Sequence, residues 1–237
     1  DLHSFPTRRS SDLQLAPEGM SLLDGDYSQI ELRVLAHLAQ DETMLNAFSE
    51  GADIHTKTAA EVFHVAIEDV TSLMRSRAKA VNFGIVYGIS DFGLSRDLDI
   101  SRKEAKEYIE GYLSTYPAIK NYMDEIVKLG KKQGFVETIL NRRRYIPELQ
   151  SKNFNIRNFG ERIALNTPIQ GSAADIIKIA MVRVYKALKK EKLKAKLILQ
   201  VHDELILQVP ENEKERVREI LRSEEHTSEL QSPSWIS

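Results

Sequence analysis

The sequence contains no cysteine among its 237 residues. Disulfide bonds and thiolate-held metal sites are therefore excluded, which fits a reducing compartment. There is no apolar run long enough to cross a membrane, and no Gly-rich loop of the kind that cradles phosphates in P-loop ATPases. The formal net charge of -2 provides no overall basic excess for nucleic acid. Any such binding must come from local basic patches, and the sequence has two candidates, Arg142–Arg144 and Lys186–Lys196.

The composition, with 42% hydrophobic and 29% charged residues, is that of a globular protein with ample chain for a core. The two ends differ from the rest. Residues 1–13 and 222–237 are polar, Ser-rich and without periodicity. They resemble translated sequencing-library adapters, so we expect artefactual flanks there; natural disordered tails are the alternative. The fold is therefore expected to be formed by residues 14–221.

One stretch, residues 74–88, carries two cations and then two aromatic rings at intervals of four residues: Arg75, Lys79, Phe83 and Tyr87. On an α-helix this spacing places all four on one stripe, whereas the nearby apolar residues lie off it. Cations can hold phosphates and rings can cover a base, so the stripe predicts a nucleotide-binding face. A solvated charged turn followed by ordinary core aromatics explains the same pattern equally well.

Two aspartates follow predicted strands. Asp26 lies where a strand gives way to a helix, and Asp203 lies at the tip of a hairpin formed by two apolar runs within residues 196–210. Taken separately, Asp26 is explained as a helix cap and Asp203 as an exposed turn residue. Taken together, two such carboxylates can hold two hard cations about 4 Å apart. Mg²⁺ is the expected ion, with Mn²⁺ as its substitute.

The remaining pattern is mainly helical. Helices are expected at 29–39, 41–49, 54–63, 68–88, 101–116, 117–132, 159–167 and 171–190, with a final charged helix from residue 212. Strands are expected at 21–28 and 135–139, besides the hairpin. Arg162, Asn166 and Gln170 are again four residues apart, although Pro168 is expected to interrupt that helix. They could contact bases or sugars from one side, or form an ordinary solvated face.

Three segments together resemble the family A DNA polymerases, the bacterial DNA polymerase I type. They are DYSQIELR at 26–33, RSRAKAVNFGIVYG at 75–88 and QVHDE at 200–204. The resemblance runs through nearly all of residues 14–221. It implies an α+β fold that forms part of a polymerase right hand. The palm, an antiparallel sheet with helices, would comprise 14–45 and 161–221, the helical fingers 46–160, and the thumb would be absent.

The resemblance also implies roles for individual residues. Asp26 and Asp203 would bind the metals with the Tyr27 carbonyl, and Glu204 would be an accessory carboxylate. The catalytic set is then Asp26, Asp203, Glu204 and Lys79. The implied nucleotide-binding set is Gln29, Glu31, His55, Arg75, Lys79, Phe83 and Tyr87. Glu31 would exclude a 2′-hydroxyl, and phenylalanine at position 83 implies discrimination against dideoxynucleotides. The implied DNA-binding set is Arg162, Asn166, Gln170 and His202.

The expected activity is template-directed DNA synthesis from dNTPs on a primer–template, with pyrophosphate release, in replication or repair. The expected protein is a monomer without membrane contact, in a bacterial cytoplasm near the nucleoid or encoded by a phage. Little processive synthesis is expected of residues 14–221 alone, because a thumb grips the duplex. A single-subunit RNA polymerase and a non-catalytic nucleic-acid-binding remnant are the alternatives. Glu31 argues against the first, and the intact pair Asp26 and Asp203 argues against the second.

Overall fold

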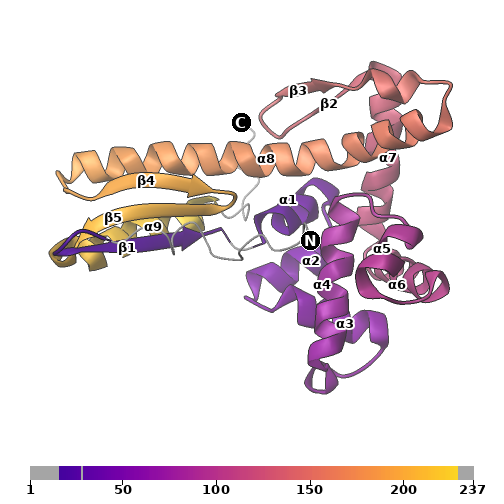
Figure 1. Cartoon of the computed structure of the whole chain (residues 1–237), viewed down its shortest axis with the longest axis horizontal. Coiled ribbons are helices and arrows are strands. Elements are labelled where there is room, and N and C mark those ends of the chain that lie inside the picture. Colours follow the sequence, from indigo (N-terminus) through magenta and orange to yellow (C-terminus); the bar gives the residue numbers. More distant parts are fainter. Residues whose placement is uncertain (1–15, 28, 229–237) are drawn as a thin grey trace, which may run out of the picture. The chain divides into compact units, whose positions relative to one another are not determined.

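The computed structural model describes residues 16–27 and 29–228, with side chains described as far as Ser223. Of these, residues 16–30 and 174–228 form one compact unit, and residues 31–173 form a second. We call them the sheet unit and the helical unit and describe each by itself. The cuts fall at the start of helix α1 (Ile30–Ala39) and within helix α8 (Phe154–Lys190), both labelled in Figure 1. The palm and fingers boundaries remain predictions.

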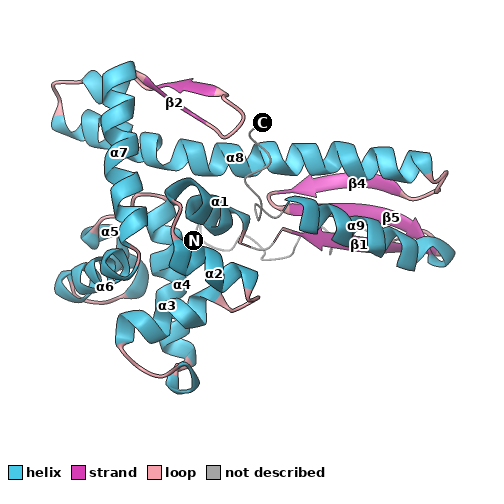
Figure 2. Ribbon diagram, turned by 180° about the vertical axis from the view of Figure 1, so that it is seen from behind, coloured by secondary structure: helices cyan, strands magenta, loops and turns pink. Residues whose placement is uncertain are grey.

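The sheet unit is built on three antiparallel strands in the order β1-β5-β4. They are β1 (Met20–Asp26), β4 (Lys196–Val201) and β5 (Glu204–Pro210). Leu205, Leu207 and Val209 alternate along β5 and are fully buried. Helix α9 (Lys214–Ser228) lies over this face, as Figure 2 shows. The predicted hairpin and the strand before Asp26 are confirmed.

Helix α9 packs directly against β1 at Gly25. A Cβ at Gly25 would lie 3.4 Å from the Leu221 side chain of α9, a van der Waals contact. Helix α9 follows a short 3₁₀ turn, η4 (Glu211–Glu213), and runs on to Ser228. The predicted charged helix is therefore confirmed, and it extends beyond residue 221.

The helical unit contains most of the helices. Their bounds are α1, then α2 (Glu42–Ser49), α3 (Ile54–Phe63), α4 (Ser72–Val86), α5 (Asp91–Leu98), α6 (Arg102–Thr115) and α7 (Pro117–Gln133), with the 3₁₀ turns η2 (Ile67–Asp69) and η3 (Pro147–Gln150). Side-chain caps set several starts. The Ser101 hydroxyl accepts from the backbone N–H of Glu104, whose carboxylate accepts from the Ser101 backbone, so a capping box fixes the start of the helix expected from residue 101.

Two expectations about helices are wrong. The helix predicted for 68–88 begins only at Ser72, because the Thr71 hydroxyl caps it by accepting from the Met74 backbone N–H at 3.2 Å. Residues 67–69 form the separate turn η2. In addition, Pro168 does not interrupt its helix, since α8 runs through it for 37 residues. A proline inside a helix costs about 3 kcal/mol. The packing of Ala164 and Ile169, both buried on either side of it, outweighs that cost.

The tri-arginine run belongs to a small hairpin formed by β2 (Phe135–Glu137) and β3 (Arg143–Tyr145). Arg142 donates from Nη2 to the Gly171 carbonyl of α8 at 3.1 Å, and Arg143 pairs with Glu137 at 2.7 Å. These two arginines therefore support the fold of the helical unit, whatever else they bind. Within residues 16–27 and 29–228, no helix has both the length and the apolar character that a membrane span needs.

A core cluster in the helical unit joins α8 to the hairpin and to η3. Val136, Ile146, Leu149 and Ala164 are buried together. Gly160 of α8 allows this close approach, because a Cβ there would lie 2.9 Å from both the Glu148 Cβ and the Leu149 backbone nitrogen. Backbone atoms cannot move aside as a flexible side chain can.

We expect Gly160→Ala to lower the free energy of unfolding by about 1–2 kcal/mol, because overpacking exceeds the gain in helix propensity. The matched control is Gly111→Ala in α6, where the added Cβ would meet only the Val62 Cγ1 at 3.5 Å. That change should stabilise the helix by up to about 1 kcal/mol. Urea denaturation followed by circular dichroism measures both. Equal effects of the two substitutions would contradict the packing argument.

Candidate active-site residues

Asp26, Asp203 and Glu204 of the sheet unit lie at the same end of the sheet. Asp26 is the last residue of β1 and is the cross-strand partner of Glu204, the first residue of β5. The Tyr27 backbone N–H donates to the Asp203 carbonyl at 3.0 Å. Directly paired residues of antiparallel strands place their side chains on one face. The pairing of β1 with β5 thus brings Asp26 beside the turn that carries Asp203.

That turn consists of His202 and Asp203, between β4 and β5. His202 has a φ of +51°, in the left-handed region, and is exposed. Two-residue hairpin loops need such a backbone for the strands to close. Strand pairing on both sides fixes the turn, so Asp203 is held on a rigid scaffold.

The donor chemistry of this acidic end fits a hard divalent cation. Carboxylate oxygens and a backbone carbonyl are the ligands that Mg²⁺ accepts, at about 2.0–2.1 Å. The Tyr27 carbonyl accepts one hydrogen bond, from the Ile30 N–H at 3.1 Å, and a carbonyl has a second lone pair. Among the described residues, no cluster of three or more His, Cys, Asp or Glu side chains forms a complete cage. A pair of carboxylates plus substrate oxygens matches how Mg²⁺ is usually held.

Helix α4 of the helical unit presents the cationic and aromatic stripe as the spacing predicts. Arg75, Lys79 and Tyr87 are exposed and Phe83 is half-buried, whereas Ala78, Val81, Ile85 and Val86 are buried. The Lys79 Nζ lies 5.9 Å from the centre of the Phe83 ring. The stripe is thus an outer face of α4 and not a row of core aromatics.

Arg75 already has an anionic partner. Its Nε donates to Asp53 Oδ2 at 2.6 Å. Burial works against the charge on Asp53, but hydrogen bonds from Arg75, Thr56 and the His55 backbone, with the charge of Arg75, outweigh it and lower the Asp53 pKa to about 2. Asp53 also caps α3, since its side chain accepts from the His55 backbone N–H. Another anion that binds Arg75 must compete with this carboxylate.

His55 is buried beneath the stripe and is 3% exposed. Its Nδ1 lies 3.0 Å from the Asn82 Nδ2, and its ring is 5.9 Å from that of Phe83. Burial is the largest influence on its pKa, and the charges of Arg75 and Lys79 lower it further, so that it falls to about 4 although Asp53 opposes this. His55 is therefore neutral at pH 7.

Sequence reasoning missed Asn82, which is fully buried on the inner side of α4. The signal was available, because a polar residue stands among apolar ones on the face that turns away from the stripe. Buried amides are retained where their hydrogen bonds are made.

Glu31 and Tyr87 are brought together within the helical unit. The Tyr87 hydroxyl donates to Glu31 Oε2 at 3.2 Å. Gln29, with a φ of +60°, belongs to the sheet unit with Asp26. The predicted nucleotide-binding residues are therefore divided between the two units.

Arg162, Asn166 and Gln170 lie along one continuous stretch of α8. The Asn166 Nδ2 donates to Gln170 Oε1 at 2.9 Å, so these two side chains share a face. Gly88 (φ +63°) follows Tyr87, and a Cβ there would lie 3.3 Å from the Arg162 Cγ. The end of the stripe is thus next to the start of this polar row. His202, the fourth predicted DNA-binding residue, lies in the sheet unit.

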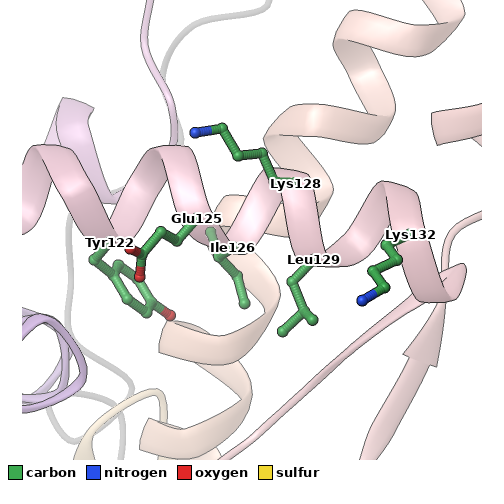
Figure 3. A pocket seen from close by; sticks show the side chains of 6 residues that line it. All are labelled: Tyr122, Glu125, Ile126, Lys128, Leu129 and Lys132. Atoms are coloured by element: carbon green, nitrogen blue, oxygen red, sulfur yellow. The ribbon is translucent and has the colours of Figure 1, made fainter.

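A surface pocket of about 430 Å³ lies along α7 (Figure 3). Its lining residues all come from that helix, as Figure 3 shows: Tyr122, Glu125, Ile126, Lys128, Leu129 and Lys132. None of the predicted site residues lines it, so it does not bear on the chemistry considered above.

Comparison with known proteins gives a consistent result. A sequence model of DNA polymerase family A matches residues 7–233. The chain is 59% identical over 209 residues to DNA polymerase I of Caldicellulosiruptor bescii, covering 88% of the chain and 25% of that protein. It is 62% identical over 192 residues to DNA polymerase I of Geobacillus stearothermophilus, covering 81% and 22%. The chain therefore spans about a quarter of the length of these curated relatives.

A solved structure agrees with the sequence relatives. It is the POL domain of Pol1 from M. smegmatis in complex with DNA primer-template and dNTP. The match has a TM-score of 0.86 and 43% identity, and it covers 90% of this chain and 38% of that one.

The ion pair of Arg75 and Asp53 leads to a pH prediction. Asp53→Asn keeps the helix cap but loses the charge, and should lower the free energy of unfolding at pH 7 by at most about 1 kcal/mol, since both side chains are more than one-third exposed. Because the Asp53 pKa is lower in the folded protein than its unfolded value of 3.8, the ionised carboxylate stabilises the fold above pH 3.8. This stabilisation disappears as the pH falls from 3.8 through about 2. Denaturation of both proteins at pH steps from about 7 to 2 measures the difference. A difference that grows toward low pH would contradict the assignment.

Proposed function

The chain belongs to DNA polymerase family A, and we propose that it carries the nucleotidyl-transfer centre of a template-directed DNA polymerase. The reaction joins a dNTP to a primer 3′-hydroxyl and releases pyrophosphate. The observation that carries this proposal is the β1–β5 register, which brings Asp26 and Glu204 together next to Asp203. The solved relative bound to primer-template and dNTP supports the same substrates.

Asp26 and Asp203, with the Tyr27 carbonyl, would hold two Mg²⁺ ions, and Mn²⁺ accepts the same oxygen ligands. When bound, such ions lower the pKa of the attacking 3′-hydroxyl and neutralise charge on the pyrophosphate. Glu204 would act as an accessory carboxylate near the primer end. The protein otherwise contributes position and charge, as phosphoryl transfer requires.

The stripe of α4 would bind the incoming nucleotide. Arg75 and the catalytic Lys79 would hold the triphosphate, and Arg75 would exchange its Asp53 partner for phosphate. Phe83 would pack on sugar and base, and Tyr87 would close the template-side end of the pocket. Gln29, Glu31 and His55 complete the proposed nucleotide-binding set.

DNA would contact the polar row of α8. Arg162, Asn166 and Gln170 can donate hydrogen bonds to minor-groove acceptors that all base pairs share, which allows checking without sequence preference. His202 would lie near the primer terminus. The palm would comprise 14–45 and 161–221 and the fingers 46–160, with α4 moving toward the palm when the correct nucleotide binds.

The natural setting is proposed on the same basis. The protein would act as a monomer in replication or repair, in a bacterial cytoplasm near the nucleoid or in a phage-infected cell. A single-subunit RNA polymerase is not favoured, because the family match is to DNA polymerases and Glu31 stands where a sugar filter is expected.

We expect Asp203→Ala, made in the full-length protein that contains this sequence, to reduce primer extension at least about 100-fold, since loss of an outer-shell partner already costs 10–100-fold at metal sites. Single-turnover extension with Mg²⁺ measures this. Asp124→Ala, on the exposed surface of α7, is the control and should extend normally. Extension by Asp203→Ala within a few-fold of wild type would refute the metal assignment.

Glu31→Ala should weaken the choice of sugar. Without the carboxylate side chain, a 2′-hydroxyl fits, and the kcat/KM ratio of ribonucleotide to deoxynucleotide should rise about 10-fold to 100-fold. Tyr87→Phe removes the hydrogen bond to Glu31 but leaves Glu31 in place, so the ratio should stay near that of wild type. If Tyr87→Phe changes the ratio as much as Glu31→Ala does, the hydrogen bond and not steric exclusion is the filter.

A further inference from the structure

A row of buried polar groups runs through the helical unit to His55. It consists of Tyr116, Thr58 and Asn82, which come from the junction of α6 with α7, from α3 and from α4. Thr58, Asn82 and Tyr116 are fully buried. The Tyr116 hydroxyl lies 3.1 Å from the Thr58 Oγ1, which lies 3.3 Å from the Asn82 Nδ2. A buried polar row of this kind is retained only where its members satisfy one another.

The direction of the hydrogen bonds follows from the distances around the Thr58 hydroxyl. Thr58 has one proton, and the Tyr116 hydroxyl at 3.1 Å is nearer than the Asn82 Oδ1 at 3.4 Å, so Thr58 donates to Tyr116.

With its proton directed to Tyr116, Thr58 offers only lone pairs to Asn82. The amide must therefore turn its NH₂ toward Thr58, and the same nitrogen lies 3.0 Å from the Nδ1 of His55. An amide nitrogen donates and does not accept, so Nδ1 is the acceptor. A neutral imidazole that accepts at Nδ1 carries its proton on Nε2.

We propose that Asn82, oriented by Thr58 and Tyr116, is a positioning residue that fixes His55 as the Nε2–H tautomer, so that His55 donates to a phosphate oxygen of the incoming nucleotide. This rests on the proposed function for the identity of the acceptor. A phosphate oxygen needs a donor, and the other tautomer would turn a lone pair toward it. Within the described part of the chain, no hydrogen-bond partner reaches Nε2.

Because His55 is neutral, its tautomer, and not its protonation state, decides whether it can donate a hydrogen bond to the nucleotide. Burial disfavours the imidazolium most, and Arg75 and Lys79 of α4 lower the His55 pKa further, whereas Asp53, the cap of α3, favours the charged form. His55 is therefore neutral wherever the polymerase works near neutral pH. A neutral imidazole donates from one nitrogen only, so the buried amide decides which.

The tautomer can be observed directly by long-range ¹H–¹⁵N NMR of the chain with ¹⁵N-labelled histidine, and His55→Gln identifies the signal. We expect Nε2–H in the wild type. In Asn82→Asp, a carboxylate accepts from Nδ1–H, so the tautomer should reverse. A wild-type Nδ1–H signal, or an unchanged tautomer in folded Asn82→Asp, would overturn the proposal.

A milder variant tests the direction of the row and keeps the test valid if Asn82→Asp does not fold. In Tyr116→Phe, the Thr58 proton is free to turn to the Asn82 oxygen, the amide can reverse, and the Nδ1–H share should rise. Tyr112→Phe is the matched control, because Tyr112 is buried 4.8 Å from Tyr116, ring to ring, and its hydroxyl has no hydrogen-bond partner among the described residues. Equal tautomer shares in the two variants would overturn the proposal.

The link to the nucleotide is tested in the full-length protein. Tyr116→Phe adds no charge, so a KM for dNTP raised about 2-fold to 10-fold, with kcat nearly unchanged, would report the lost donor. Tyr112→Phe should keep the wild-type KM. If Tyr116→Phe shifts the tautomer but leaves the KM unchanged, His55 does not donate to the nucleotide and the proposal fails. The tautomer signal itself requires no polymerase activity, so it is independent of the proposed function.

Discussion

The acidic site depends on one constraint, the antiparallel pairing of β1 with β5. These strands lie far apart in the sequence, and their register sets Asp26 opposite Glu204 and the Tyr27 amide against the Asp203 carbonyl. A slip of one residue would turn every side chain of β1 to the opposite face. The buried residues Leu23, Leu205 and Leu207 oppose such a slip, because it would expose them. The apolar face of the sheet therefore fixes the position of the carboxylates on the other face.

Helix α4 combines two kinds of surface. Its outer face carries Arg75 and Lys79, whose charge suits phosphates, and its inner face carries Asn82, which is buried against Thr58 and His55. Burial is the main reason why the His55 imidazole is neutral, and the outer cations lower its pKa further. The two faces are therefore coupled through charge, although the side chains lie on opposite sides of one helix.

Local chemistry accounts for predictions that are confirmed, and longer-range packing accounts for the wrong prediction at Pro168. The helix expected from residue 101 is an example, because the capping box of Ser101 acts within a few residues and is readable directly. Pro168 is expected to divide its helix, because a proline in a helix interior removes a backbone hydrogen bond. The helix continues because Ala164 is buried against Val136, Ile146 and Leu149, which lie outside α8 and which no local rule includes. The helix start at Ser72 differs from the expected one because the Thr71 side chain caps the helix there.

The sequence by itself determined the family, through three motifs that hold most of the proposed site residues, and it determined the exposed stripe of α4 through a spacing of four residues. Periodicity is sufficient to predict that stripe, because residues four apart lie on the same face of an α-helix. Only the tertiary structure decided that Arg75 is paired with Asp53, that the tri-arginine run supports α8, and that Asn82 contacts His55. These contacts join residues from different elements, and a linear pattern does not encode which polar groups will meet once the chain is packed.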